Sequence, residues 1–123
     1  MLSQATVVTF VATARPEQAK EFYEQTLGLR LVYDDMFAIV FDLNGIMLRV
    51  QKVQMHTPPQ YTVLGWDVKD LSAEVAELQA RGVRCERYPG MEQDEAGIWI
   101  APSGAKLAWF KDPDGNTLSL TQF

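Results

Sequence analysis

The sequence has very little of the residues that build redox and metal chemistry. It holds one cysteine, Cys85, and one histidine, His56, in 123 residues. A lone cysteine excludes a disulfide within the chain and is typical of a reducing compartment, so we expect a cytoplasmic protein. We interpret Cys85 as a small apolar filler of a strand and His56 as a solvated loop residue.

Long hydrophobic runs and positive charge are also scarce. No apolar run approaches the roughly 20 residues that a membrane-spanning helix needs. Residues 1–10 lack the basic start and long apolar stretch of a secretion signal. The formal net charge is -5, and nucleic acids and anionic membranes select positive surfaces. We therefore expect no nucleic-acid and no membrane partner.

Motifs of nucleophilic and nucleotide-dependent chemistry are missing. The sequence shows no serine-histidine-acid arrangement and no glycine-rich phosphate loop. What is present is the composition of an ordinary globular domain, with 47% hydrophobic and 22% charged residues. A chain of this length can bury a substantial core as one domain.

The first half of the chain predicts one strand, one helix and three further strands. Pro16 suits the first turn of a helix, and Gly28 is a natural helix stop. Asn44-Gly45 is a strong signal for a tight hairpin turn. The predicted strands cover residues 5–12, 29–33, 37–43 and 46–53, and the predicted helix covers residues 16–26.

The second half repeats this order after a predicted linker at residues 54–60. Asp70 or Ser72 is available to cap a helix that ends near Gly82. The closing hairpin turns at Asp112-Pro113-Asp114-Gly115-Asn116, where Pro113 and Gly115 favour a tight turn. The predicted strands cover residues 61–68, 83–88, 97–101, 105–110 and 117–121.

The two halves therefore form an internal repeat with a period of about half the chain. Phe-Asp-Leu-Asn-Gly at residues 41–45 matches Lys-Asp-Pro-Asp-Gly at residues 111–115. We predict an α+β fold in a single domain, with a first module at about residues 5–53 and a second at about residues 61–123. Each module has one helix, which covers only one face of its sheet.

The sequence resembles the vicinal oxygen chelate superfamily of glyoxalases, bleomycin resistance proteins and dioxygenases over essentially its whole length. The resemblance rests on Phe22-Tyr23 with Leu27-Gly28-Leu29, on the Gly65–Asp70 strand-to-helix junction, and on Phe110–Asn116. It implies two tandem βαβββ modules that form a cupped mixed sheet with the helices on the outer face. It also implies a ligand inside the cup and, often, a homodimer.

The resemblance also implies where a metal enzyme of this kind would place its ligands. Those positions fall on Val8, Arg49, Val63 and Ser119, with Met47 or Gln51 as alternatives to Arg49. Valine and arginine do not bind a divalent cation, and serine is a poor ligand. We therefore expect no metal cofactor and no Lewis-acid chemistry.

Strand alternation predicts which side chains line the groove. Arg49 could receive a carboxylate or a phosphate bidentately, or it could pair with a structural acid such as Asp67. Trp66, out of phase, should pack under the second helix, and the acidic residues 92–95 form either a mobile lip or a solvated loop. The candidate ligand-binding residues are Val8, Phe10, Met47, Arg49, Gln51, Val63, Asp67, Trp99, Trp109 and Ser119.

These observations favour a metal-independent protein that binds a small organic molecule in the cup between its modules. The first alternative is an enzyme, a lyase, isomerase or dioxygenase, with an atypical site that uses Arg49, Asp67, His56 or Ser119. The second alternative is a non-catalytic interaction module whose groove is filled by its own side chains. One fold hosts many functions, so the ligand stays open at this point.

Overall fold

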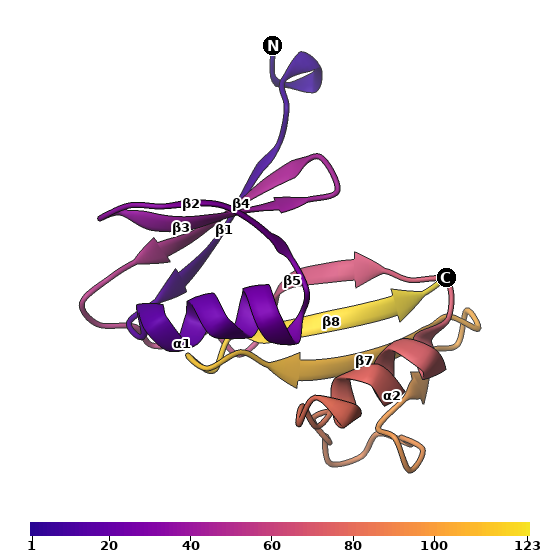
Figure 1. Ribbon diagram of the computed structural model, residues 1–123. Coiled ribbons are helices and arrows are strands. Elements are labelled where there is room, and N and C mark those ends of the chain that lie inside the picture. Colours follow the sequence, from indigo (N-terminus) through magenta and orange to yellow (C-terminus); the bar gives the residue numbers. More distant parts are fainter. The chain divides into compact units, whose positions relative to one another are not determined.

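The computed structural model describes all residues, 1–123, and divides them into two compact units. Unit 1 covers Met1–Thr57 and unit 2 covers Pro58–Phe123. Each unit contains a four-stranded mixed sheet with one helical segment between its first two strands, and unit 1 begins with an additional short 3-10 helix (Figure 1). This confirms the predicted tandem βαβββ architecture.

Unit 1 has the strand order β1-β4-β3-β2, in which β1 and β4 are parallel and the other pairs are antiparallel. The chain connects β3 and β4 through Asn44 and Gly45, whose φ angles of 51° and 95° are those of a type I′ hairpin turn. The elements are η1 (Leu2–Gln4), β1 (Val8–Thr13), α1 (Pro16–Glu21), η2 (Phe22–Thr26), β2 (Arg30–Asp34), β3 (Ala38–Leu43) and β4 (Ile46–Lys52).

One face of the unit 1 sheet carries the core. Tyr23 of η2 is fully buried, and its ring lies 5.9 Å from the ring of Phe41 on β3. The predicted helix is confirmed, but its second part is a single π-turn, in which the amide of Leu27 donates to the carbonyl of Phe22. The buried strand residues of this face are Val11, Thr13, Ile39, Phe41, Leu48 and Val50.

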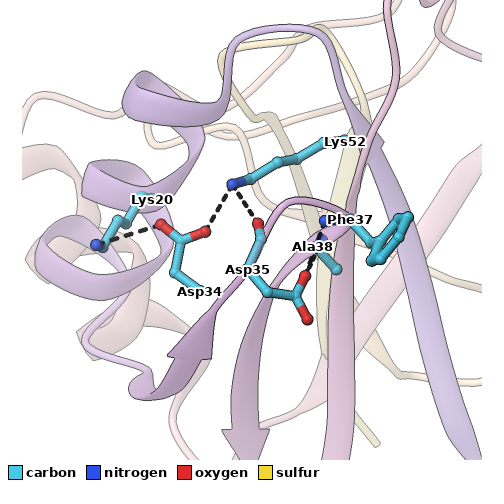
Figure 2. Close-up of polar contacts among 6 residues, drawn as sticks. All are labelled: Lys20, Asp34, Asp35, Phe37, Ala38 and Lys52. Atoms are coloured by element: carbon cyan, nitrogen blue, oxygen red, sulfur yellow. Dashed lines mark hydrogen bonds and ion pairs between the residues drawn. The ribbon is translucent and has the colours of Figure 1, made fainter.

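An ion-pair cluster joins helix α1 to the sheet at the edge of this face (Figure 2). Lys52 Nζ donates to Asp34 Oδ1 at 2.7 Å and to the carbonyl of Asp35 at 2.6 Å. Lys20 Nζ lies 3.4 Å from Asp34 Oδ2. The Lys52 hydrogen bond is the main reason why the pKa of Asp34 lies below its ordinary value.

Unit 2 has the strand order β5-β8-β7-β6, with β5 and β8 parallel. Helix α2 contacts β7 and β8, and Asp70 caps it by accepting a hydrogen bond from the amide of Ala73. Trp66 stacks on Phe110 of β7, at 6.5 Å between ring centroids, which places it on the predicted core face. The elements are β5 (Thr62–Asp67), α2 (Leu71–Ala80), β6 (Trp99–Ile100), β7 (Lys106–Lys111) and β8 (Thr117–Gln122).

The turn between β7 and β8 is organised by one buried carboxylate. Asp112 Oδ1 accepts hydrogen bonds from the amides of Asp114 and Asn116, and Oδ2 accepts from Asn116 Nδ2. The amide of Gly115, which has a φ of 83°, donates to the carbonyl of Asp112. The predicted turn is therefore held by its acidic residue as much as by proline and glycine.

The strands pair in the same register in each of the two units. Arg49 pairs with Phe10 and Val40 in unit 1, and Ser119 pairs with Gly65 and Trp109 in unit 2. Arg49 and Ser119 therefore hold equivalent positions in the two modules.

Two details of unit 2 differ from the prediction. Residues 83–88 form no strand, and only the amide of Glu86 bonds to β7, at the carbonyl of Trp109. In β5 the register shifts between Thr62 and Leu64, so Thr62 faces Thr117 and Val63 has no partner on β8. Simple alternation had placed Val63 in the groove, and the bulge explains why that register position passes to Thr62.

No helix of the chain has both the length and the apolar character needed to cross a bilayer. The longest regular helix, α2, has 10 residues.

Candidate functional site

The second face of the unit 1 sheet has no helix of its own module and carries the first group of candidate residues. Phe10 is 55% exposed, Val8 is 42% exposed and Met47 is 37% exposed. Strand register places Val8 beside Met47, Phe10 beside Arg49, and Gln51 two residues further along β4. We call this surface the open face of unit 1; by register it consists of Val8, Phe10, Ala12, Arg30, Tyr33, Ala38, Val40, Asp42, Met47, Arg49 and Gln51.

Arg49 lies in the middle of the open face of unit 1. Tyr33, Val40, Arg49 and Phe10 follow one another in a row across the four strands. Arg49 Nη1 donates to Tyr33 Oη at 3.0 Å, although two strand spacings, about 10 Å, separate their backbones. The pair spans the strand between them, and Val40 below is fully buried.

The partner of Arg49 is therefore a neutral phenol. Arg49 forms no ion pair with a carboxylate of its own unit, whereas Lys20, Arg30 and Lys52 all do. Sequence reasoning singled out Arg49 but missed this bond to Tyr33. The bond requires the irregularity between Leu31 and Tyr33 in β2, which sets Tyr33 opposite Val40.

The corresponding surface of unit 2 carries the second group of candidate residues. Asp67 pairs with Thr121, and Gly65 pairs with Ser119, which is next to Trp109 on β7. Asp67 is exposed and Ser119 is 8% exposed. We call this surface the open face of unit 2; it consists of Thr62, Gly65, Asp67, Trp99, Leu107, Trp109, Lys111, Thr117, Ser119 and Thr121.

Three aromatic rings meet on the open face of unit 2. The ring of Trp109 lies 6.1 Å from Trp99 and 5.5 Å, edge-on, from Tyr88. All three side chains are partly exposed. Burial, with a smaller contribution from the charge of Glu86, raises the pKa of Tyr88, so its phenol is neutral at physiological pH. This aromatic cluster offers flat apolar surface and one hydroxyl.

Gly65 leaves room for the side chain of Ser119, which pairs with Trp109 of the aromatic cluster. A Cβ atom at Gly65 would lie 2.6 Å from Ser119 Oγ, closer than real Cβ contacts. Only glycine fits there without movement of Ser119. Where unit 1 has the Phe10 ring and a guanidinium at the equivalent positions, unit 2 therefore has a small hydroxyl and no side chain.

Residues 86–97 next to the cluster form a tightly hydrogen-bonded loop. Gln93 Nε2 donates to the carbonyls of Glu86 and Gly97, and Gln93 Oε1 accepts from the amide of Tyr88, all at 2.8 Å. Arg87 Nη2 donates to the carbonyls of residues 94 and 95 at 2.7 Å. Of the two predictions for the acidic residues 92–95, the structure favours an ordered surface loop. The role of Gln93 was not predicted.

The remaining candidates for chemistry lie apart from these groups. Cys85 is half-buried, and burial is the main cause that raises the pKa of its thiol. His56 lies outside the helices and strands, in the segment after β4. Neither side chain belongs to the open face of its unit.

Comparisons with known proteins identify the fold. The family model of the Glyoxalase/Bleomycin resistance protein/Dioxygenase superfamily matches residues 5–120. The chain belongs to this superfamily.

Solved structures of superfamily members have the same fold at low sequence identity. A member from Sphaerobacter thermophilus is 20% identical, with 100% of both chains covered and a TM-score of 0.77. Lactoylglutathione lyase from Agrobacterium tumefaciens is 17% identical over 97% of this chain and 93% of its own, with a TM-score of 0.75. The glyoxalase family protein from Enterococcus faecalis is 20% identical over 99% and 100%, with a TM-score of 0.71.

The metal that the glyoxalase resemblance implies does not fit the residues of this superfamily member. Val8 and Val63 carry no side-chain donor atom, and Thr62, which takes the register position of Val63, offers only one hydroxyl. Arg49 is a cation already bonded to Tyr33. Ser119 offers one hydroxyl, packed against Gly65. Nor does the chain bring together three or more His, Cys, Asp or Glu side chains in a group that could hold a metal ion.

Proposed function

We propose that this superfamily member is a metal-independent protein that binds a small organic molecule on the open faces of its sheets. The proposal is carried by the residues at the positions that the resemblance assigns to metal ligands, which are Val8, Arg49, Val63 (or, by register, Thr62) and Ser119. Those positions lack ligands, while the surrounding face keeps exposed apolar and aromatic side chains. Small-molecule sites are built this way, with apolar walls and a few placed polar groups.

The aromatic cluster supplies the largest apolar surface of unit 2. Aromatic rings stack on one another with offset or edge-on geometry, worth about 0.5–1.5 kcal/mol per pair beyond area burial. Trp99 and Trp109 are partly exposed and already meet each other and Tyr88. The cluster therefore supports binding of an organic molecule with a flat apolar part.

Elemental analysis and a thermal-stability screen test the proposal. Protein purified without chelator is expected to contain far less than one equivalent of Mn, Fe, Co, Ni, Cu or Zn. EDTA is expected to leave its melting temperature unchanged. In a panel of small metabolites and antibiotics, some compounds should raise the melting temperature, because a ligand at about 100 times its Kd stabilises the native state by about 2.7 kcal/mol.

Two results would contradict the proposal. One is a near-stoichiometric metal ion that EDTA removes with loss of stability. The other is a panel in which compounds raise the melting temperature only when a divalent metal is present. Consumption of a stabilising compound, followed by mass spectrometry, would establish the enzyme alternative.

A matched pair of variants tests the aromatic cluster. Trp99 and Ile100 are neighbours on β6, and only Trp99 is directed to the open face of unit 2, because Ile100 pairs with Lys106 on the other face. Trp99→Leu is expected to weaken binding of an aromatic compound found in the screen at least fivefold. Ile100→Ala is expected to leave it unchanged. Equal effects would exclude the cluster as the binding surface.

A further inference from the structure

Arg49 places a positive charge beside the exposed apolar side chains Val8, Phe10 and Met47 and forms no ion pair, whereas Asp42, the carboxylate on the same face, pairs with Arg30. The side chain is half-buried and donates one hydrogen bond, to the neutral hydroxyl of Tyr33. A guanidinium carries five N–H donors in a fixed planar arrangement. Most of the donor capacity of Arg49 is therefore not used within unit 1.

Two carboxylates of unit 1, Asp42 and Asp35, have other bonding partners. Asp42 pairs with Arg30 at 3.6 Å and accepts from the amide of Gly45. Asp35 Oδ1 accepts from the amides of Ala38 and Phe37 at 2.9 and 2.8 Å. These backbone bonds hold the pKa of Asp35 below its ordinary value, and Arg49 adds only a smaller electrostatic contribution from beyond ion-pair distance.

The surroundings of the guanidinium strengthen its attraction for an anion. Phe10 lies next to Arg49 in the register and is 55% exposed, and Val8 and Met47 form the adjacent exposed pair. Beside low-dielectric side chains a charge interacts more strongly than in open water. The bond to Tyr33 also holds the guanidinium in place, so little side-chain freedom remains to be lost on binding.

We propose that Arg49 binds the carboxylate of the ligand, and that the apolar body of the ligand rests on Phe10. The ligand class is thus a small organic acid with an apolar, preferably aromatic, group one or two bonds from its carboxylate. Arginine recognises a carboxylate bidentately, through two parallel N–H···O bonds. Tyr33 acts as a positioning residue. The inference rests on the proposed function, because it names the ligand class for the same open face.

Sodium phenylacetate is a suitable probe, with two matched compounds. Phenylacetamide keeps the shape and removes the charge, and sodium acetate keeps the charge and removes the ring. Binding is measured by titration of the amide resonances of the full chain in ¹H–¹⁵N spectra at low salt. We expect phenylacetate to bind, with shifts centred on residues 8–10, 33 and 47–51. We expect the amide and acetate to bind at least tenfold more weakly.

Variants test whether binding requires the guanidinium of Arg49 and its place on the open face. Arg49→Met keeps the apolar stem and is expected to lower phenylacetate affinity at least tenfold. Arg15→Met makes the same change at an exposed arginine of the same unit and is expected to have no effect. Arg49→Lys keeps the charge and should recover part of the affinity. Tyr33→Phe removes only the hydroxyl that holds Arg49 and should reduce affinity two- to fivefold.

The inference is overturned if phenylacetate does not bind even at 50-fold the concentration used in the phenylacetamide and acetate titrations. It is likewise overturned if phenylacetamide binds as well as phenylacetate. It is also overturned if a folded Arg49→Met variant, verified by its dispersed spectrum, binds phenylacetate like the wild type. Screening hits that are all neutral would overturn this inference and leave the proposed function intact. Phenylacetate binding that requires an added divalent metal would instead overturn the proposed function.

Discussion

The close approach of Gly65 to Ser119 gives a sharp test of the unit 2 surface. Gly65 lies in extended backbone of β5, where alanine is compatible with the chain conformation. The Cβ atom of Gly65→Ala would lie 2.6 Å from Ser119 Oγ, 3.3 Å from the Ser119 carbonyl oxygen and 3.9 Å from Ser119 Cβ. The only severe contact is therefore with a single hydroxyl oxygen.

The expected magnitude follows from two opposing effects. Forcing an extra methyl group into a packed site costs about 1–3 kcal/mol. Replacing glycine by alanine in a strand returns about 0.5–1 kcal/mol of backbone entropy. We expect Gly65→Ala to lower the free energy of unfolding by about 1 kcal/mol, which is about 3–5 °C in melting temperature for a chain of this size.

A double-mutant cycle with Ser119→Ala isolates the contact. Removal of the hydroxyl leaves the Ser119 Cβ at 3.9 Å, an ordinary contact, and the backbone carbonyl oxygen at 3.3 Å, a tight one. The loss caused by Gly65→Ala should therefore fall to near zero in that background. The coupling free energy from urea unfolding of the four proteins is expected to be about 1–2 kcal/mol. The same loss in both backgrounds would refute the steric explanation, and so would a stabilised Gly65→Ala single variant.

Three further predictions concern the hydrogen bonds that hold the scaffold. Asp112→Asn replaces Oδ2, which accepts from the side-chain amide of Asn116, with an NH₂ donor. The change should lower the free energy of unfolding by about 1–3 kcal/mol, measured by urea denaturation. Gln93→Glu cannot donate to the two backbone carbonyls that Gln93 now holds, so limited proteolysis should cut residues 86–97 faster, while Gln93→Glu with unchanged cleavage would contradict the loop structure. Asp34 has a lowered pKa in the folded state because of Lys52, so its stabilising effect is complete well above pH 3.8 and is lost as the pH falls below that value. The difference in stability between the wild type and Asp34→Asn, below about 1 kcal/mol, should therefore shrink on acidification in circular-dichroism melts.

The predictable part of the fold came from signals that act locally. Asn44-Gly45 predicts a hairpin because both residues tolerate positive φ, and both adopt it. The repeated sequence before the last strand of each half predicts two equivalent sheets, and the shared register bears this out. Trp66 was assigned to the core face by alternation alone, and its ring stacks there on Phe110.

The unpredicted part depends on side chains that compete with strand pairing. Residues 83–88 have strand-forming composition, but Gln93 binds the backbone groups of Glu86 and Tyr88 that a ladder would use. In β5, the bulge at Val63 changes which residue faces Thr117. A side-chain amide five to seven residues along the chain decides the first case, and pairing with a distant strand decides the second. Neither signal is visible in local composition.

The candidate site was predictable to the same extent. Alternation correctly grouped Phe10, Met47 and Arg49 on one face, because period-two geometry needs no tertiary information. The bond between Arg49 and Tyr33 crosses an intervening strand and depends on an irregular register in β2. That bond distinguishes an anchored guanidinium from a solvated one, and only the structure shows it.

Arg49 and Ser119 hold equivalent positions in the two modules, so the protein contains two versions of the same strand position with different side chains. A cation and a small hydroxyl occupy equivalent places in two sheets of the same strand order, so this backbone pairing accommodates both kinds of side chain. Exchange of the two side chains, one residue per module, would change the charge of each open face while the backbone hydrogen bonds of the sheets stay the same.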